Sequence, residues 1–244
     1  MKLKKNDVVL FSGDSITDGN RGKSMDCNHI MGHGYQYIVA SELALENAEN
    51  MPKFINKGYS GENAVDLLGK WQRDVLDNKP TVLSILVGVN EGSYGYFNGL
   101  TPDEASERYE TNLRAILELT RKELGDIKII LMEPFYCPLD ASDRSYKFTP
   151  HPDGVEPPFE RPDANDPEDS IGYREQVNIR IRAAALRLAE DFGCAFVPLY
   201  DKIYENAKRT RLEYFIWDGT HPSIAGHMLI AREWLKAVEK HFGS

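Results

Sequence analysis

The chain has 244 residues, of which 41% are hydrophobic and 10% aromatic, so it can bury a sizeable core and is not an intrinsically disordered protein. Its formal net charge is −9, and an acidic surface of this kind repels phosphate, which argues against nucleic acid as a partner. The cysteines, Cys27, Cys137 and Cys194, are too few and too widely spaced for a disulfide framework or a zinc site, and we expect neither a metal nor a cofactor.

Several lysines stand near the N-terminus, as in a signal peptide, but the apolar run behind them covers only Val8–Phe11. This run is too short for the core of a signal peptide, and no stretch of about 18 apolar residues could cross a membrane. We therefore expect a soluble cytoplasmic protein that does not attach to a membrane.

Short apolar runs alternate along the chain with longer segments in which apolar residues recur at helical spacing. The runs predict strands at Val8–Phe11, Phe54–Asn56, Val82–Val87, Ile127–Met132 and Ala195–Val197. The longer segments predict helices over Tyr35–Ala44, after Asn63, from Thr101 and Pro102, from Val177, and over Ile224–Phe242. This alternation indicates βαβ units with right-handed crossovers, and therefore an α/β protein with a mostly parallel five-stranded sheet.

The sequence also predicts which residues of two helices are buried. Asn63 is suited to cap the N-terminus of the helix that follows it. That helix is expected to face the core with Val65, Leu68, Trp71, Val75 and Leu76. The final helix is expected to face inward with Met228, Leu229, Ala231, Leu235 and Val238.

The chain contains no internal repeat and no linker, and we expect residues 1–244 to form one domain. Residues 137–172 interrupt the alternation with a segment rich in proline and aspartate. A structureless stretch of this length in a compact domain is uncommon. It is either a variable solvated loop, or a lid or subunit-contact loop near the active face, because loops that follow sheet strands lie there.

Four polar segments follow predicted strands, and parallel sheets bind ligands beyond the carboxyl ends of their strands. The segments are Gly13–Ser15, Gly58–Asn63, Gly88–Glu91 and, after the fifth strand and a further helical stretch, Trp217–Ser223. Because the carboxyl ends of parallel strands meet at one edge, we expect the four segments to converge there.

Together the segments supply the groups that acyl transfer requires. A serine is a weak nucleophile until a base removes its proton, and His221 can act as that base for Ser15. Asp218 lies three residues before His221, from where its carboxylate can orient the ring. The backbone N–H groups of Ser15 and Gly61 and the side-chain amide of Asn90 are candidate donors to the oxyanion that forms.

Each segment also has an interpretation without chemistry. Gly13–Ser15 can be a tight turn of small polar residues, and Asp218–Ser223 can be a turn that starts the final helix around a buried His221. All four segments in this order, each after a predicted strand, are much harder to explain in that way. The combination therefore favours a catalytic site.

The stretches GDSIT, NKGYSGEN, GVNE and DGTHPS resemble, in this order and over nearly the whole chain, the four motif blocks of the SGNH hydrolases, also called the GDSL esterase family. The resemblance implies a flavodoxin-like fold, a three-layer α/β/α sandwich, and ester hydrolysis by a Ser–His–Asp triad without metal. It implies that Ser15 is the nucleophile, that Gly61 and Asn90 complete the oxyanion hole, and that Asp218 and His221 complete the triad. No GxSxG motif is present, which argues against an ordinary α/β-hydrolase.

Longer stretches carry a more specific resemblance. LFSGDSITDGNR, MEPFY and WDGTHPSIAGHMLIAREWL look like bacterial acetylxylan esterases of this superfamily, which remove acetyl groups from xylo-oligosaccharides. In that group the tryptophan before the triad aspartate lies at the active site, so the resemblance implies such a place for Trp217. It also implies a homo-oligomer and a small-molecule substrate with a short acyl group, acetyl, on a carbohydrate hydroxyl.

Two other functions stay open at this point. One is that of a lysophospholipase or thioesterase of the same superfamily, and the other is that of a carbohydrate-binding protein that kept the fold and lost turnover. The chain has no long apolar segment suited to a fatty acyl chain. The presence of Ser15, Asn90, Asp218 and His221 together weighs against a loss of turnover.

Asp14, Arg21 and Trp217 are the candidates for the substrate-binding side of the site. Asp14 is expected to brace the turn of Ser15 by hydrogen bonds rather than to titrate. Glu91 departs from the family pattern, which has an aspartate after the asparagine, and the packing around that loop is therefore an open question.

The remaining histidines are not expected to be catalytic. His227 lies among apolar neighbours in the final helix and is expected to pack there, whereas His151 lies in the 137–172 segment and is expected to be solvated. His29 and His33 stand near Cys27, but no fourth ligand follows at a spacing that would complete a metal site.

Overall fold

The structure is a computed structural model, and it describes residues 1–22, 26, 29–139 and 168–243. Its centre is a sheet formed by β1 (Val8–Gly13), β2 (Lys53–Gly58), β3 (Val82–Leu86), β4 (Lys128–Met132) and β5 (Ala195–Val197). The order across the sheet is β2-β1-β3-β4-β5, and every neighbouring pair is parallel. The predicted parallel five-stranded sheet is confirmed, and each predicted strand overlaps a strand of the structure.

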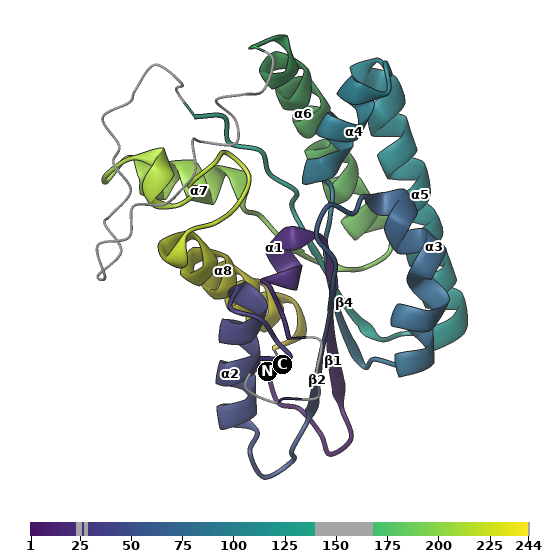
Figure 1. Cartoon of the computed structure of the whole chain (residues 1–244). Helices are drawn as coiled ribbons and strands as arrows, with labels where there is room; N and C mark the ends of the chain where they lie inside the picture. The colour runs from purple at the N-terminus through teal and green to yellow at the C-terminus, as the bar shows by residue number, and fades with distance from the viewer. Residues whose placement is uncertain (23–25, 27–28, 140–167, 244) are drawn as a thin grey trace.

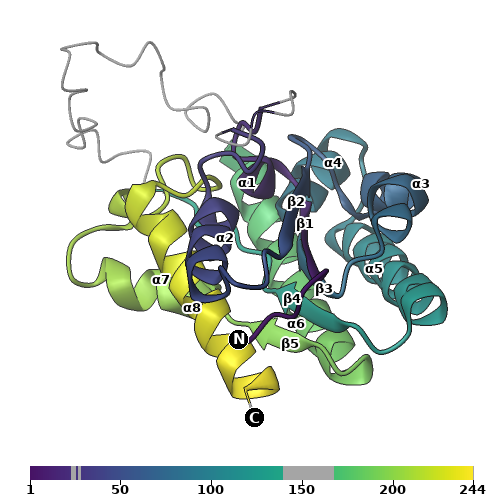
Figure 2. The same ribbon diagram turned by 90° about the horizontal axis from the view of Figure 1, so that it is seen from below.

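Helices cover both faces of the sheet, as Figure 1 and Figure 2 show. On one face lie α2 (Tyr35–Glu46), α7 (Tyr200–Ala207) and α8 (Ile224–Phe242), and on the other lie α3 (Ala64–Asp74), α5 (Pro102–Leu124) and α6 (Glu168–Asp191). Each face buries its own apolar cluster, with Trp234 of α8 in the first and Trp71 of α3 in the second. This is the three-layer α/β/α fold that the resemblance to SGNH hydrolases implies.

The strand order explains where a ligand can bind. From β1 the chain moves outward to the edge strand β2 and then crosses back to β3, on the other side of β1. Parallel sheets bind ligands beyond the carboxyl ends of their strands at the point where the strand order reverses in this way. The short helix α1 (Ser15–Asp18) follows β1 at that point (Figure 1), and it begins with Ser15.

Side-chain caps start two helices where the sequence predicts them. The side chain of Asn63 accepts hydrogen bonds from the N–H groups of Val65 and Asp66, and Thr101 caps α5 by accepting from the N–H of Glu104. In both helices the acidic residue of the first turn accepts in return from the N–H of the capping residue, which completes a capping box. Contacts this local depend only on nearby sequence, which is why both starts can be predicted.

The predicted inward faces of α3 and α8 are partly wrong. Val65 is 37% exposed and Met228 is 40% exposed, whereas Leu67, Ile230 and Trp234 are buried. Successive side chains are turned by about 100° around a helix axis. A small error in the predicted orientation of the helix on the sheet therefore exchanges a buried position for an exposed one. The orientation is set by the sheet beneath, which the helix sequence alone does not contain.

Two segments differ from the sequence-based expectation. α4 (Val89–Phe97) begins inside the stretch expected to be a loop. The sequence does not predict this helix because Gly92 and Gly95 weaken the helical signal. The segment predicted to be irregular, 137–172, overlaps α6, which already begins at Glu168. At its other end, Cys137 and Leu139 are buried. Residues 140–167 lie outside the described residues, so both interpretations of that stretch stay predictions.

Short 3₁₀ turns complete the connections before β3 and before α8, at Leu76–Asn78 (η1) and Leu212–Tyr214 (η3). Within the described ranges, none of the helices combines the length and the apolarity that a membrane span requires.

Candidate active site

Ser15 is the first residue of α1, directly beyond the end of β1. Asp14 caps this short helix, because its carboxylate accepts a hydrogen bond from the N–H of Ile16 at 3.0 Å. Gly13 is required at the end of the strand, since a Cβ there would lie 2.1 Å from the carbonyl oxygen of Leu86 on β3. The turn is thus held by the strand and by its cap, and it presents the Ser15 hydroxyl at the carboxyl edge of the sheet.

His221 lies within hydrogen-bonding distance of Ser15, although 206 positions separate the two residues in the chain. Nε2 of His221 is 2.8 Å from the hydroxyl oxygen of Ser15, and Nδ1 is 2.6 Å from Oδ2 of Asp218. An ionised carboxylate can only accept, so Nδ1 carries a hydrogen and Nε2 of the neutral ring accepts from the serine. The three side chains form one continuous hydrogen-bond series.

The loop around Asp218 is held from two directions. Oδ1 of Asp218 accepts hydrogen bonds from the N–H groups of Thr220 at 2.9 Å and of His221 at 2.6 Å. Cys137, which follows β4, donates its N–H to the carbonyl of Gly219 at 2.8 Å. The carboxylate is therefore anchored within its own loop, and the loop is anchored to the segment beyond β4.

The electrostatic surroundings make His221 more basic than an exposed histidine. Burial acts to lower its pKa, but the hydrogen bond and charge of Asp218, together with the charge of Asp14, outweigh burial. The pKa of His221 therefore lies above its usual 6.5. Imidazole groups titrate close enough to neutral pH to take up a proton and return it within one reaction cycle.

Asp14 braces the turn as predicted, but the structure corrects two other expectations about it. It is 1% exposed, so it is closed off from a ligand at the edge of the sheet. Burial, the largest influence, raises its pKa to about 7 in spite of the hydrogen bond from Ile16 and the charge of His221. Asp14 is therefore a buried bracing residue that titrates near neutral pH, and not a substrate contact.

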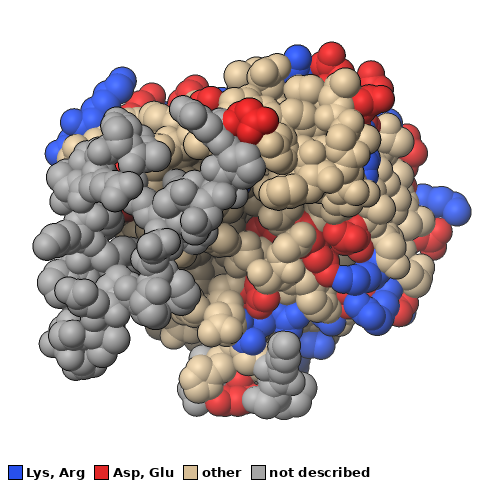
Figure 3. Space-filling view, turned by 45° about the horizontal axis from the view of Figure 1, so that its top comes forward, with Lys and Arg blue, Asp and Glu red and all other residues tan. Residues whose placement is uncertain are grey.

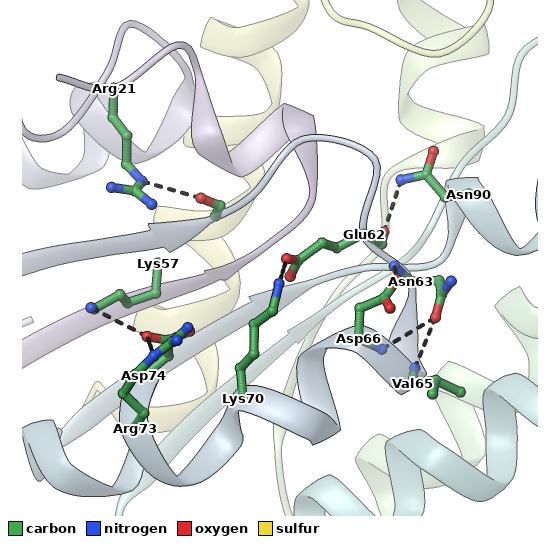
Figure 4. A network of polar contacts seen from close by, with 11 residues as sticks. Arg21, Lys57, Glu62, Asn63, Val65, Asp66, Lys70, Arg73, Asp74 and Asn90 are labelled. Atoms are coloured by element: carbon green, nitrogen blue, oxygen red, sulfur yellow. Dashed lines mark hydrogen bonds and ion pairs between the residues drawn. The ribbon is translucent and has the colours of Figure 1, made fainter. Parts of the chain in front are cut away.

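Besides the N–H of Ser15, the predicted oxyanion donors come from the loops after β2 and β3, the two strands that flank β1. Gly61 follows β2 with a φ of 83°, which favours glycine, and no heavy atom lies within 4 Å of where its Cβ would be. Asn90 lies in the first turn of α4, and its side-chain amide donates to the carbonyl of Glu62 at 2.8 Å (Figure 4). This bond ties the two loops together and orients an amide whose second hydrogen can be donated to an oxyanion.

Glu91, the departure from the family pattern, is completely buried and joins two helix starts. Its Oε1 accepts from the N–H of Ala64 at 2.8 Å, and its Oε2 accepts from Nη1 of Arg108 at 2.6 Å. Arg108 also donates to the side chain of Asn63, the cap of α3, at 3.2 Å. The longer acid therefore connects the start of α4, which carries Asn90, to the start of α3, and this answers the question of packing around the loop.

Trp217 and Arg21 lie at the same edge of the sheet. The half-buried ring of Trp217 stacks beside that of His221, with 6.3 Å between the centroids and 27° between the planes. Nε of Arg21 donates to the carbonyl of Gly58 at 3.1 Å (Figure 4), and its guanidinium carbon lies 4.8 Å from the centroid of the Tyr59 ring. Trp217 thus places an aromatic ring beside His221, whereas Arg21 holds the loop after β1 against the end of β2.

Sequence patterns missed Arg174, a residue of α6 that reaches the loop of His221. Its Nη2 donates to Oγ1 of Thr220 at 3.3 Å, and its guanidinium carbon lies 4.1 Å from the centroid of the Tyr136 ring. Its charge acts to lower the pKa of His221. Arg174 belongs to no motif, and only the packing of α6 brings it here, so no local signal could reveal it.

His227 packs as predicted, and the other described histidines stay outside the site. Nδ1 of His227 accepts the first N–H of α2 at 3.1 Å, and burial lowers its pKa to about 4. His29 bonds to Asp26 at 2.6 Å on the surface, while His151 and Cys27 lie outside the described residues. In the part of the chain that the structure describes, no three potential metal-ligating side chains gather.

Figure 3 looks toward this edge of the sheet. On the part that the structure describes, acidic and basic side chains lie among uncharged ones, and neither sign dominates the face.

The fold and the geometry at its edge define a class of protein. A serine hydroxyl, a histidine and a buried carboxylate in one hydrogen-bond series recur, on unrelated folds, in serine hydrolases. Here the series stands at the carboxyl edge of a parallel sheet, where α/β enzymes bind their ligands.

Comparison with known proteins gives the family. The model of the GDSL-like lipase/acylhydrolase family matches residues 11–229, and the chain belongs to this family. An acetylxylan esterase from Geobacillus stearothermophilus is 28% identical over 242 residues, which are 98% of this chain and 96% of that protein. A crystal structure of this esterase has a TM-score of 0.72 and covers 98% of this chain and 96% of its own. A crystal structure from Parabacteroides merdae, described as a GDSL-like lipase, is 33% identical with a TM-score of 0.76 and covers 96% of both chains.

The matches confirm the predicted family and fold, and they support esterase activity.

Proposed function

We propose that the protein is a serine esterase in which Ser15 is the nucleophile, His221 the general base and Asp218 the residue that orients the base. One observation carries the proposal: the hydroxyl oxygen of Ser15 lies 2.8 Å from Nε2 of His221, whose Nδ1 lies 2.6 Å from Asp218. The serine proton can move along an existing hydrogen bond, and the positive charge that then forms on the ring is stabilised by the carboxylate beside it.

The reaction starts when Oγ of Ser15 attacks the carbonyl carbon of the ester. As the new C–O bond forms, the serine proton passes to Nε2 of His221 and the carbonyl oxygen becomes an oxyanion. The N–H groups of Ser15 and Gly61 and the amide of Asn90 donate to this oxygen. His221 then gives its proton to the oxygen of the leaving alcohol as that C–O bond breaks, which leaves an acyl group on Ser15.

Water completes the cycle. His221 removes a proton from a water molecule, whose oxygen attacks the acyl carbon and forms a second oxyanion on the same donors. The bond to Oγ of Ser15 then breaks, the serine recovers its proton from His221, and the carboxylic acid is released. Each proton in this mechanism moves through His221, so the proposed cycle involves no cofactor.

The proposed substrate is an acetyl ester of a carbohydrate, such as an acetylated xylo-oligosaccharide. The similarity to an acetylxylan esterase over nearly the full length of both chains supports this choice. The Trp217 ring beside His221 supports it as well, because an aromatic side chain with one polar end suits a sugar ring that is apolar on its faces and polar at its rim. The sequence also has no long apolar segment suited to a fatty acyl chain.

The deciding experiment measures the release of acetate from acetylated xylo-oligosaccharides and from p-nitrophenyl acetate. Wild type is expected to hydrolyse both, and Ser15→Ala is expected to hydrolyse neither above background. Ser41→Ala is the matched control, since Ser41 is an exposed serine of α2 whose hydroxyl donates to the carbonyl of Tyr37. Turnover that persists in Ser15→Ala contradicts the mechanism.

Two further measurements separate the alternatives. A series of p-nitrophenyl esters from two to sixteen carbons tests the acyl length, and equal or faster turnover of the long esters favours a lysophospholipase or thioesterase. A fluorophosphonate probe tests for catalysis, because it labels a serine only where a base activates it. Binding of xylo-oligosaccharide without labelling of Ser15 favours a carbohydrate-binding protein.

Cellular location and assembly stay predictions. We propose a cytoplasmic homo-oligomer, and size-exclusion chromatography with light scattering on the purified chain measures its assembly directly.

A further inference from the structure

Arg174 extends from α6 toward the loop that carries Asp218 and His221. Its Nη2 donates a hydrogen bond to Oγ1 of Thr220, the residue before His221, at 3.3 Å. Its guanidinium carbon lies 4.1 Å from the centroid of the ring of Tyr136, which is buried beyond β4. Arg174 therefore contacts both the neighbour of the proposed base and the segment that follows β4.

The segment after β4 contacts the same loop directly. The N–H of Cys137 donates to the carbonyl of Gly219 at 2.8 Å. A Cβ at Gly219 would lie 3.2 Å from the carbonyl oxygen of Cys137 and 3.6 Å from the ring of Tyr136, so the two segments are closely packed. Arg174, which lies on Tyr136, extends this support to Thr220.

Glycines of α4 make room for Arg174. A Cβ at Gly92 would lie 3.1 Å from Cγ and 3.2 Å from Cα of Arg174, and a Cβ at Gly95 would lie 2.3 Å from the hydroxyl oxygen of Tyr173. Larger residues at these two positions would push α6 away from α4, and Arg174 away from the loop. The close approach of the two helices is therefore what places Arg174 where it is.

Charged groups of both signs face His221 from the elements around it. Asp218 in its own loop and Asp14 at the end of β1 favour the protonated ring, whereas Arg174 on α6 favours the neutral ring. His227 on α8, with a pKa of about 4, is neutral at the pH at which His221 titrates. A general base must be neutral to accept a proton, so the charge of Arg174 acts to keep His221 competent.

We propose that Arg174 is a positioning residue for His221: it braces the loop of Asp218 and His221 through Thr220, and it holds a fixed positive charge beside the ring. This inference rests on the proposed function, because it assigns Arg174 a task in the proton transfers of that mechanism. It contains two separable parts, a hydrogen bond that orients the loop and a charge that acts on the base.

Three variants separate the two parts. Arg174→Met removes both the charge and the hydrogen bond, Arg174→Lys keeps the charge without the planar donor group, and Thr220→Val removes the hydrogen bond alone. Arg180→Met is the matched control, because Arg180 lies on the same helix and pairs with Asp103 of α5 at 2.6 Å. If Arg174→Met does not fold, Arg174→Gln removes the same charge with a polar side chain.

The charge is tested by the pKa of His221, followed by NMR on protein with labelled histidine and assigned by comparison with His221→Asn. Arg174→Met is expected to raise this pKa by about 0.5 to 1 unit. Arg174→Lys, Thr220→Val and Arg180→Met are expected to leave it unchanged. An unchanged pKa in Arg174→Met, or an equal rise in Arg180→Met, overturns this part of the inference.

The bracing is tested by kcat and KM for p-nitrophenyl acetate across the pH range. Thr220→Val and Arg174→Lys are expected to lower kcat by about 3- to 10-fold with little change in KM. Arg174→Met is expected to show the same loss of kcat and also a shift of the acidic limb of kcat/KM to higher pH. A kcat in Thr220→Val equal to that of wild type overturns the proposal that Arg174 braces the loop. The NMR titration needs no substrate, so an inactive wild type with the expected shift means that the proposed function fails and the effect of the Arg174 charge stands.

Discussion

The two sides of the site are built in different ways. The side that transfers protons is a loop, and the side chain of His221 at its end is 39% exposed. The side proposed to bind the oxyanion rests on Glu91, a fully buried carboxylate that pairs with Arg108 at 2.6 Å. The ionisable group of the proton-transfer side, His221, is therefore partly in contact with water, whereas that of the oxyanion side, Glu91, lies inside the protein.

The difference follows from what each side must do. A base has to change its charge during the reaction, so its surroundings must tolerate both states, and nearby charges adjust the balance between them. Donors to an oxyanion have to stay in place, and a buried ion pair with satisfied hydrogen bonds holds two helix starts in one geometry. The comparison predicts that changes near His221 alter the pH dependence, whereas changes near Glu91 alter kcat and stability.

The largest effect is expected on the proton-transfer side. His221→Asn removes the base, and kcat for p-nitrophenyl acetate is expected to fall by roughly 10⁴- to 10⁶-fold. His227→Asn is the matched change, since His227 accepts a backbone N–H of α2 at 3.1 Å and has no part in the mechanism. It is expected to lower stability while kcat stays close to wild type, and equal losses in the two variants would contradict the assignment of the base.

A smaller effect is expected from the oxyanion side. Asn90→Ala removes one donor, and kcat is expected to fall by about 10²- to 10³-fold with little change in KM, because the bond forms only as charge develops on the oxygen. Asn98→Ala is the control at the other end of α4, where the Asn98 amide donates to the carbonyl of Tyr94. An effect of Asn90→Ala on KM alone would mean that Asn90 binds the ground state instead.

Glu91→Gln tests the support behind that donor. The variant keeps an acceptor for the N–H of Ala64 but leaves Arg108 without its opposite charge, and the free energy of unfolding is expected to fall by about 3 kcal/mol. kcat is expected to fall by roughly 10-fold, because Asn90 is held less firmly.

Glu133→Gln is the control for this test. Glu133 is another buried carboxylate that pairs with an arginine, Arg182, and it accepts from the N–H of Leu199. Glu133→Gln should lower the free energy of unfolding without a comparable loss of kcat. Equal losses of kcat in the two variants would show that Glu91 acts only through global stability, and denaturant unfolding with steady-state kinetics supplies both quantities.

The smallest effect on rate concerns pH. In wild type, kcat/KM is expected to rise with pH through the pKa of His221, which lies above 6.5. Asp14→Asn keeps an acceptor for Ile16 but removes a group that favours the protonated ring whenever it is ionised, so the acidic limb should move to lower pH. This is the opposite of the shift expected for Arg174→Met, and shifts of the same sign in the two variants would contradict the electrostatic account.

Asp14 also leaves a signature in stability. Its pKa in the folded protein is about 7, against 3.8 for an ordinary aspartate, so between these values the folded state keeps a proton that the unfolded chain has lost. Stability from this group is present at low pH and is lost as pH rises from about 4 to 7. Relative to Asp14→Asn, wild type is expected to lose a few kcal/mol of unfolding free energy over this range, and parallel curves for the two proteins would show that Asp14 is ionised throughout.

The sequence by itself determined the frame of the molecule. Apolar runs, helical spacing and the caps Asn63 and Thr101 depend on residues that are close together in the chain, and the sheet and helix starts that they predict are present. The parallel sheet then required the polar ends of β1, β2 and β3 to meet at one edge. Ser15, Gly61 and Asn90 could be placed at the site for this reason.

Only the tertiary structure decided which side chains touch. Glu91 reaches Ala64 and Arg108, and Arg174 reaches Thr220, because α3, α4, α5 and α6 pack at distances set by their contact surfaces. Burial likewise turned Asp14 from an ordinary aspartate into a group that titrates near pH 7. These properties depend on residues far apart in the chain, and on the loss of water around them, so no local pattern carries them.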